Sequence, residues 1–217
     1  MQPNMAQVLN TLAHEIRTPL AVSQGYLKLY VDGRLAKPDD QQRALQQTRE
    51  ALGVIAVLCA DIGKVSALAE AGAPALLERL DAMDLAADLR DRVELAHATA
   101  IGEPPAGPIA TNAPMDLVRA IAVVMKSAFD EAKQEPFHYE WHADGEALVI
   151  RAGTVEGVRA LPSTADGDGA AAVNVVRGGK GLTLIWAAFV LEQHGIQTWN
   201  HAAHKASVGF RLPMVRL

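Results

Sequence analysis

The sequence predicts an α+β protein, in which an antiparallel helical hairpin forms a dimeric four-helix bundle and is followed by an α/β sandwich. In the first seventy residues, mostly apolar side chains recur in alternating steps of three and four, which is typical of long amphipathic helices. After Ala71-Gly72-Ala73-Pro74 this period stops, and helices alternate with short strand-like runs. We therefore expect a helical dimerisation domain at residues 1–72 and an α/β domain at residues 73–217.

Two helices of about 30 residues make the predicted hairpin. The first runs from about 3 to 31 and ends at Asp32-Gly33, where glycine can take the left-handed cap conformation. Lys37-Pro38-Asp39-Asp40 is typical of a turn before an N-cap, and the second helix follows from about 40 to 70. The predicted apolar seams are Met5, Leu9, Leu12, Ile16, Pro19, Ser23, Tyr26 and Tyr30, and Leu45, Thr48, Leu52, Ile55, Cys59, Ile62, Ser66 and Ala69.

A twofold-symmetric homodimer is predicted because one hairpin buries only one stripe per helix. Leu58, Val65 and Leu68 lie beside the seam of the second helix and also need cover. A second hairpin would supply it. Cys59 falls on the apolar stripe, so we expect a small buried hydrophobic side chain without a redox role.

The α/β domain is expected to begin with a strand at 76–80 and a helix at 85–99. A Pro/Gly loop leads to a strand near Ile109 and a helix at 114–133. Strands at 137–141 and 147–151 flank Asp144-Gly145 as a β-hairpin. The remaining expected elements are a loop at 153–172 holding at most a short strand, a helix at 181–194, and strands at 196–201 and 207–212.

Composition limits the classes of function. The formal net charge of −5 argues against nucleic acid or an anionic membrane as partner, since both favour a basic surface. The single cysteine excludes an internal disulfide and fits a reducing cytosol. No uninterrupted run of eighteen apolar residues is present, so we expect a cytoplasmic protein without a membrane span.

The stretch from Ala13 to Leu20 combines a histidine, a carboxylate and a proline. His14 lies two residues from both Leu12 and Ile16, so it should point away from the seam into water. Glu15 can accept the proton on one ring nitrogen and leave the other to attack, while Pro19 loosens the turn after His14. From the helix alone, a surface histidine without a role is an equal alternative.

His14-Glu15-Ile16-Arg17-Thr18-Pro19-Leu20 resembles the phosphoacceptor motif of bacterial two-component sensor histidine kinases over all seven residues. The resemblance implies that His14 carries a phosphoryl group on a ring nitrogen and exchanges it with a response-regulator aspartate. It implies that Glu15 is the acid/base partner of the imidazole and that Thr18 acts in dephosphorylating the regulator. It also implies a docking surface for receiver domains below the histidine, at Arg17, Thr18, Ala21, Val22 and Gly25, with the facing part of the second helix.

The order of elements from 76 to 217, with Gly181-Leu182-Thr183-Leu184 and Gly209-Phe210-Arg211-Leu212-Pro213, resembles the ATP-binding domain of the same kinases. The magnesium-holding asparagines of that family should fall near Val123 and Ser127, and neither is asparagine. Its adenine-binding aspartate should fall within 151–153, which holds Arg, Ala and Gly. Its last glycine box keeps Gly179 and Gly181 but has Thr183 where the family generally has glycine.

These replacements predict that ATP binding is lost. Removing an adenine anchor costs about 2 to 5 kcal/mol of a nucleotide-binding free energy of about 6 to 8 kcal/mol. The glycine-rich start of the last helix, with Gly179 and Gly181, could still hold a phosphate, but it is equally well explained as a turn and N-cap. We expect no cofactor of the chain's own, with magnesium supplied by the receiver partner.

A metal site is not predicted. His138, Glu140 and His142 alternate along one strand and share a face, and His201 and His204 follow later. Histidines scattered on strands are common, and no cysteine joins them.

The leading hypothesis is a histidine phosphotransfer protein, in which His14 takes a phosphoryl group from one receiver aspartate and gives it to another. An ATP-dependent histidine autokinase with a divergent nucleotide pocket is the first alternative. A pseudokinase scaffold that binds regulators without carrying phosphate is the second.

Overall fold

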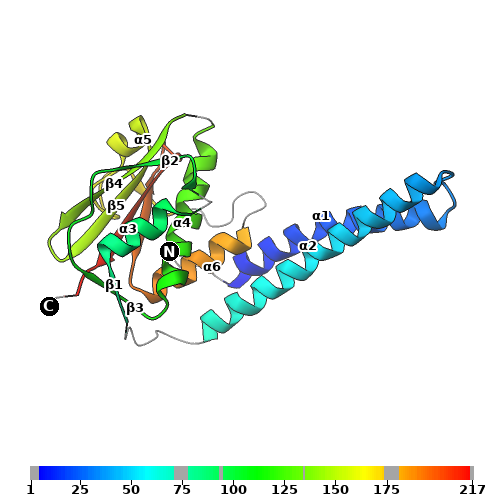
Figure 1. Cartoon of the computed structure of the whole chain (residues 1–217), viewed down its shortest axis with the longest axis horizontal. Helices are drawn as coiled ribbons and strands as arrows, with labels where there is room; N and C mark the ends of the chain where they lie inside the picture. Colours follow the sequence, from blue (N-terminus) through cyan, green and yellow to red (C-terminus); the bar gives the residue numbers. More distant parts are fainter. Residues whose placement is uncertain (1–4, 71–77, 93–94, 134, 174–180, 216–217) are drawn as a thin grey trace.

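The computed structural model describes residues 5–70, 78–92, 95–133, 135–173 and 181–215. Helices α1 (Met5–Val31) and α2 (Pro38–Glu70) form an antiparallel hairpin that projects from an α/β domain (Figure 1). The predicted fold class of a helical hairpin followed by an α/β domain is confirmed. The predicted boundary between residues 72 and 73 falls in 71–77, outside the described residues, and stays a prediction.

The α/β domain contains a six-stranded sheet with the order β2-β4-β5-β8-β7-β6, next to a two-stranded sheet of β1 and β3. Strands β2 and β4 are parallel, and the other pairs are antiparallel. The strands are β1 (Glu78–Asp81), β2 (Ala98–Ile101), β3 (Pro108–Thr111), β4 (Phe137–Asp144), β5 (Ala147–Thr154), β6 (Ala170–Ala171), β7 (Gln197–His201) and β8 (Ser207–Pro213). The helices are α3 (Ala82–Arg90), α4 (Pro114–Glu131), α5 (Val155–Ala160) and α6 (Gly181–Gln193).

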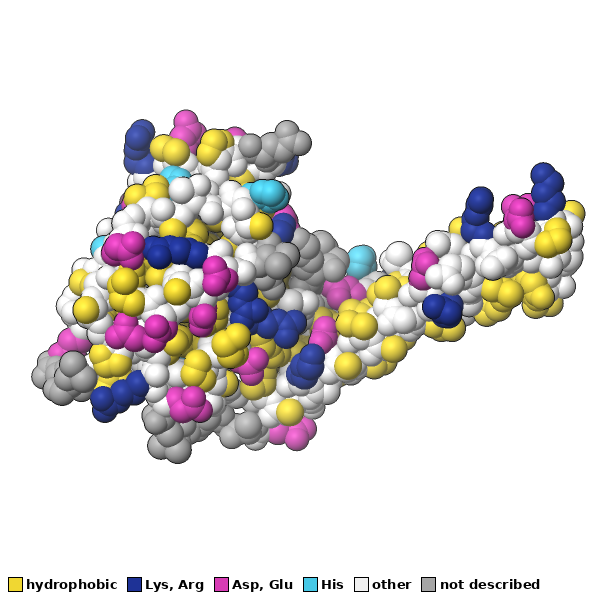
Figure 2. Space-filling view, viewed as in Figure 1, with side chains coloured by type: hydrophobic (Ala, Val, Ile, Leu, Met, Phe, Trp, Pro, Cys, Tyr) yellow, Lys and Arg dark blue, Asp and Glu magenta, His cyan; other side chains and the backbone are white. Residues whose placement is uncertain are grey.

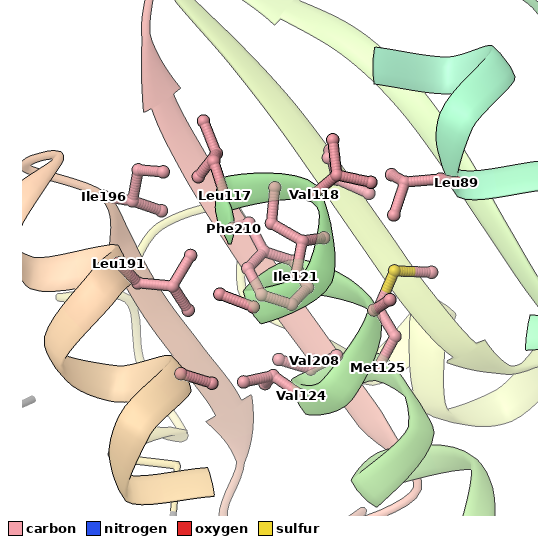
Figure 3. Close-up of a cluster of buried hydrophobic side chains, with 14 of the residues drawn as sticks. Leu89, Leu117, Val118, Ile121, Val124, Met125, Leu191, Ile196, Val208 and Phe210 are labelled. Carbon is pink, nitrogen blue, oxygen red and sulfur yellow. The ribbon is translucent and has the colours of Figure 1, made fainter. Parts of the chain in front are cut away.

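Helix α4 lies at the centre of the core, between α6 and the sheet (Figure 3). Its buried side chains include Leu117, Ile121 and Met125, because apolar residues recur along it with the helical period. Figure 3 shows this α4 row meeting Leu191 and Ile196 on one side, Val208 and Phe210 of β8 on another, and Leu89 of α3. The sheet therefore has one face packed against helices.

Two predicted elements are wrong. The helix expected at 85–99 ends at Arg90, and Ala98–Ile101 forms β2, because these residues find backbone partners in Phe137–Glu140 of β4. The first part of the loop expected at 153–172 is helix α5, whose N-terminus is capped by the Thr154 hydroxyl accepting from Gly157 N at 3.1 Å. The short strand allowed in that loop is present as β6.

The apolar seams of the hairpin divide into two faces. Ser23 and Thr48 of the predicted seams are buried, as are Val8, Ala44 and Ala51, which the predicted seams did not include. Other predicted seam residues, Leu9, Leu45, Leu52 and Cys59, are exposed, so the expectation of a buried Cys59 is wrong for the single chain. The reason is geometric: a two-helix hairpin covers only one of the two apolar positions in each heptad.

Helix α6 covers the residues for which a second hairpin was expected. Val65 is buried, and Leu58 and Leu68 pack against the same hydrophobic cluster as Leu182 and Ile185 of α6. The Gln193 side-chain amide donates to the Leu68 carbonyl at 2.9 Å. The cover expected from another protomer thus comes from the chain's own α/β domain.

By length and composition alone, residues Pro38–Leu68 of α2 could cross a membrane, against the expectation that the chain has no such segment. One such helix is weak evidence for a span, because length and composition are its only grounds, and 11% of its apolar window is buried in the single chain. The cytoplasmic location stays a prediction.

A buried histidine ties α6 to the start of α4. His194 Nδ1 lies 2.7 Å from the Val190 carbonyl, which can only accept, so this nitrogen carries the proton. Its Nε2 therefore accepts from the Thr111 hydroxyl at 3.0 Å, and Thr111 Oγ1 in turn accepts from Ala113 N. Burial lowers the pKa of His194, against the raising effects of the Val190 carbonyl and Asp116.

This network predicts loss of stability in acid. Because the pKa of His194 is lowered in the folded chain, the unfolded state binds more protons as pH falls below about 6.5. Stability is complete above that pH and decreases as pH falls toward the folded-state pKa. Denaturant unfolding at pH 7.5 and 5.5 should show a lower midpoint in acid.

The matched variant is His194→Gln, which should cost about 1–3 kcal/mol at neutral pH because it leaves buried partners unpaired. Its stability should change less between the two pH values than that of the parent chain. An equal pH dependence in both proteins would contradict the assignment to His194.

Candidate functional site

His14 is exposed on α1, about two and a half turns from the first described residue of the helix. Helix α1 continues without a break through Pro19, although proline supplies no N–H to the carbonyl of Glu15 four residues earlier. The expected loosening after His14 therefore does not interrupt the helix. Glu15 is half-buried and points about 100° around the helix from His14.

Helix α1 presents three different faces. One packs against α2 through half-buried and buried side chains such as Pro19, Ser23 and Tyr26. A second is apolar but exposed and carries Leu9, Leu20, Leu27 and Val31. The third is the His14 face, on which His14 and all the predicted docking residues are exposed: Arg17, Thr18, Ala21, Val22 and Gly25. The structure thus brings the predicted site residues, except Glu15, onto one open surface.

Burial along α1 shows where the α/β domain reaches. Thr11, Thr18 and Gly25 are seven residues apart and so hold equivalent positions relative to α2. Thr11 is 5% exposed, whereas Thr18 and Gly25 are exposed to solvent. A parallel series runs from Val8 at 4% to Val22 at 39%. The α/β domain therefore covers the side of α1 before His14, and this cover ends at His14, which the sequence did not predict.

The positions that resemble an adenine-binding loop hold a different structure. The Arg151 guanidinium donates to the carbonyls of Val158 and Leu161, the latter at 2.8 Å, and lies 3.7 Å from a Glu140 carboxylate oxygen. These bonds fix the end of α5 to the sheet. Trp199 strengthens the same attachment by donating to the Pro162 carbonyl at 2.9 Å.

Backbone from the β7–β8 connection fills the adjoining space. Thr154 N donates to the Ala206 carbonyl at 3.1 Å, and a Cβ added at Gly153 would lie 2.6 Å from that same oxygen. Between α4 and β8, beside half-buried Ser127, a cavity of about 20 Å³ remains, which holds about one water molecule. Val123 is also half-buried on α4.

A larger open hollow of about 250 Å³ adjoins this cavity. Its lining includes the carboxylates Glu131, Glu135 and Glu156, together with the His204 imidazole and the Lys205 ammonium group. Of the two glycines that resemble a phosphate loop, Gly181 begins α6, and Gly179 lies outside the described residues.

Histidines outside α1 form no metal centre in the described part of the chain, where no group of three His, Cys, Asp or Glu side chains could hold an ion. The rings of His201 and His204 lie 4.9 Å apart. His201 Nδ1 accepts from the backbone N–H groups of Ala203 and His204, so this nitrogen stabilises a turn.

Comparison with known proteins identifies the class of the hairpin. Residues 4–64 match the His Kinase A (phospho-acceptor) domain, a stretch that contains His14 and its motif. No curated protein matches the chain at a significant level.

Solved structures share the whole architecture. Histidine kinase AdeS of Acinetobacter baumannii aligns over 94% of this chain and 98% of its own, with 18% identity and a TM-score of 0.56. Full-length ShkA in complex with AMPPNP aligns over all of this chain, with 14% identity and a TM-score of 0.51, and this chain spans 47% of its length. Residues 4–64 thus contain a His Kinase A phospho-acceptor domain, and the chain as a whole shares its fold with these two histidine kinase structures.

Proposed function

We propose that this chain is a histidine phosphotransfer protein of two-component signalling, in which His14 exchanges a phosphoryl group with receiver-domain aspartates. The observation that carries the proposal is an exposed His14 in a complete phosphoacceptor motif, beside an α/β domain whose expected nucleotide contacts are replaced. The match to a phospho-acceptor domain supports the same role.

The transfer needs few groups from this chain. One ring nitrogen of neutral His14 attacks phosphorus, a N–P bond forms, and the bond to the receiver carboxylate oxygen breaks. The carboxylate of Glu15 would hold the proton on the other ring nitrogen and stabilise the imidazolium that develops. Return of the phosphoryl group to a second receiver reverses these steps. Thr18 lies one helical turn after His14 on the same exposed face of α1. The receiver brings the metal that neutralises phosphate charge.

The docking surface would be the His14 face of α1. Ala21 and Gly25 have small side chains, and nothing lies within 4 Å of a Cβ placed at Gly25. A partner helix can therefore approach the backbone closely, with Val22 as an apolar contact and Arg17 as a charged one.

Loss of ATP binding is part of the proposal. Arg151 replaces a carboxylate that would recognise adenine, and it is bound to α5. Val123 and Ser127 offer no amide oxygen to magnesium. The open hollow sets three carboxylates against one ammonium group, that of Lys205, and this excess of negative charge disfavours a triphosphate. An autokinase with a divergent pocket and a non-catalytic scaffold remain the competing functions.

We further propose a homodimer through the exposed apolar faces of the hairpin. Leu9, Leu20 and Leu27 continue along α1, and Leu45, Leu52 and Cys59 follow at heptad spacing along α2. Four helices packed on these faces would bury both rows, as in a four-helix bundle. The His14 face and the α/β domain lie on other sides of the hairpin. This packing would also account for the apolar character of α2.

Phosphoryl transfer is tested with radiolabelled substrates. The chain should acquire label from a phosphorylated receiver domain and none from Mg·ATP, and His14→Ala should abolish labelling. Acid-labile, base-stable label would identify a phosphohistidine. Labelling from ATP would favour the autokinase, and absence of label from both donors would favour the scaffold.

Docking is tested with an arginine on the open helix face. Gly25→Arg should slow transfer from the receiver at least about tenfold, because about 1.4 kcal/mol of lost binding corresponds to that factor. Gly53→Arg is the matched control, since nothing lies within 4 Å of a Cβ there either and it projects from the far side of α2. Equal rates in the two variants would exclude the proposed surface.

Dimerisation is tested with charges on the exposed apolar faces. Leu20→Arg combined with Leu52→Arg should give a monomer in sedimentation experiments while helical circular dichroism is kept, since both side chains are exposed in one chain. Val57→Arg, exposed on another side of α2, should remain a dimer. A dimer in the double variant would contradict the proposed interface.

A further inference from the structure

We propose that the α/β domain is permanently docked beside His14 as a fixed wall, so that a partner reaches the histidine only from the side of the hairpin tip. This inference concerns a contact inside the chain and holds whether or not His14 carries phosphate. It therefore stands or fails independently of the proposed phosphotransfer.

The contact is built as an interior. Val8 of α1 and Val65 of α2 are 4% and 2% exposed and belong to the same hydrophobic cluster as the core of the α/β domain. Leu12, Leu58, Ile62 and Leu68 pack against that cluster from the hairpin side. A contact made of continuous apolar packing resembles the inside of one domain, whereas domains that move freely meet through smaller and more polar surfaces.

Helix α6 is the element that joins the two parts. Its residues from Leu182 to Leu191 are apolar except Thr183, and all are buried or half-buried. A helix that is apolar on every side needs cover on every side. The sheet domain covers α6 through α4, and α1 and α2 cover the remaining surface, with Gln193 bonded to the Leu68 carbonyl. Undocking would expose this helix to water.

The position of the wall follows from the heptad-related threonines. Thr11 and Thr18 are seven residues apart, so both occupy the same heptad position facing α2. Thr11 is nevertheless buried, whereas Thr18 is exposed. Helix α6 contacts α1, and Val8 and Leu12 on either side of Thr11 pack in its hydrophobic cluster, so the α/β domain reaches the Thr11 level of the hairpin. His14 lies between these two threonines. The α/β domain lies on the N-terminal side of His14, and the exposed residues Thr18, Val22 and Gly25 follow toward the α1–α2 loop. A receiver domain therefore meets one accessible side.

Thiol accessibility tests the docking with a matched pair of sites. In a Cys59→Ser background, Thr11→Cys and Thr18→Cys each provide one thiol, read with the disulfide reagent DTNB. Thr11→Cys should react at least about 100-fold more slowly than Thr18→Cys, since reaction requires opening of the contact. Mg·ATP should not change either rate. Rates within threefold of each other, or acceleration of Thr11→Cys by Mg·ATP, would overturn the proposal.

A second variant separates cover by the α/β domain from cover by α2. Val65→Asp places a charge in the shared cluster and should raise the Thr11→Cys rate toward that of Thr18→Cys, with helical circular dichroism retained. Phe189→Ala, a milder change in half-buried packing on α6, should act in the same direction if Val65→Asp unfolds the chain. If Thr11→Cys still reacted slowly in a folded variant, α2 would be what shields residue 11, and the proposed docking of the α/β domain beside His14 would be wrong.

Discussion

The packing of α6 is the interaction on which the remaining structure depends. This helix is apolar around its whole circumference, so no single neighbour can cover it. The α/β core buries part of its surface, and the open end of the hairpin buries the rest, including Val8 and Val65. Burying one such side chain is worth about 1.5–3 kcal/mol. The two domains thus share one core, and the relative position of their surfaces follows from it.

The shared core also explains why one helix can serve three purposes. Near its beginning, α1 contributes Val8 and Leu12 to the core, so that stretch is unavailable to partners. Beyond His14 the α/β domain no longer covers it, and the face with Thr18 and Gly25 opens. A third face keeps its leucines exposed along the full length. Because the faces are separated around the helix, pairing of hairpins and docking of a receiver would not compete.

Local pattern was sufficient for the parts of the fold that repeat along the chain. The limits of α1, α2, α4 and α6 and the β4–β5 hairpin follow from periodicity and turn residues, and the exposure of His14 follows from its offset from Leu12 and Ile16. Long-range partners decided the remainder. Ala98–Ile101 becomes a strand because β4 pairs with it, and the cover of Leu58 and Leu68 comes from residues more than one hundred positions later.

The α/β domain satisfies polar groups of β5 through its own backbone. The Arg151 guanidinium donates to the Leu161 carbonyl, and Thr154 N donates to the Ala206 carbonyl. These polar groups of β5 therefore have their hydrogen-bond partners within the chain. Under the proposed loss of ATP binding, a nucleotide would have to break these hydrogen bonds to make new ones. The domain would then contribute through its shape and its contact with the hairpin. Under the proposed function, the metal and the carboxylate of the reaction come from the partner, and this chain needs to hold one imidazole in an accessible place.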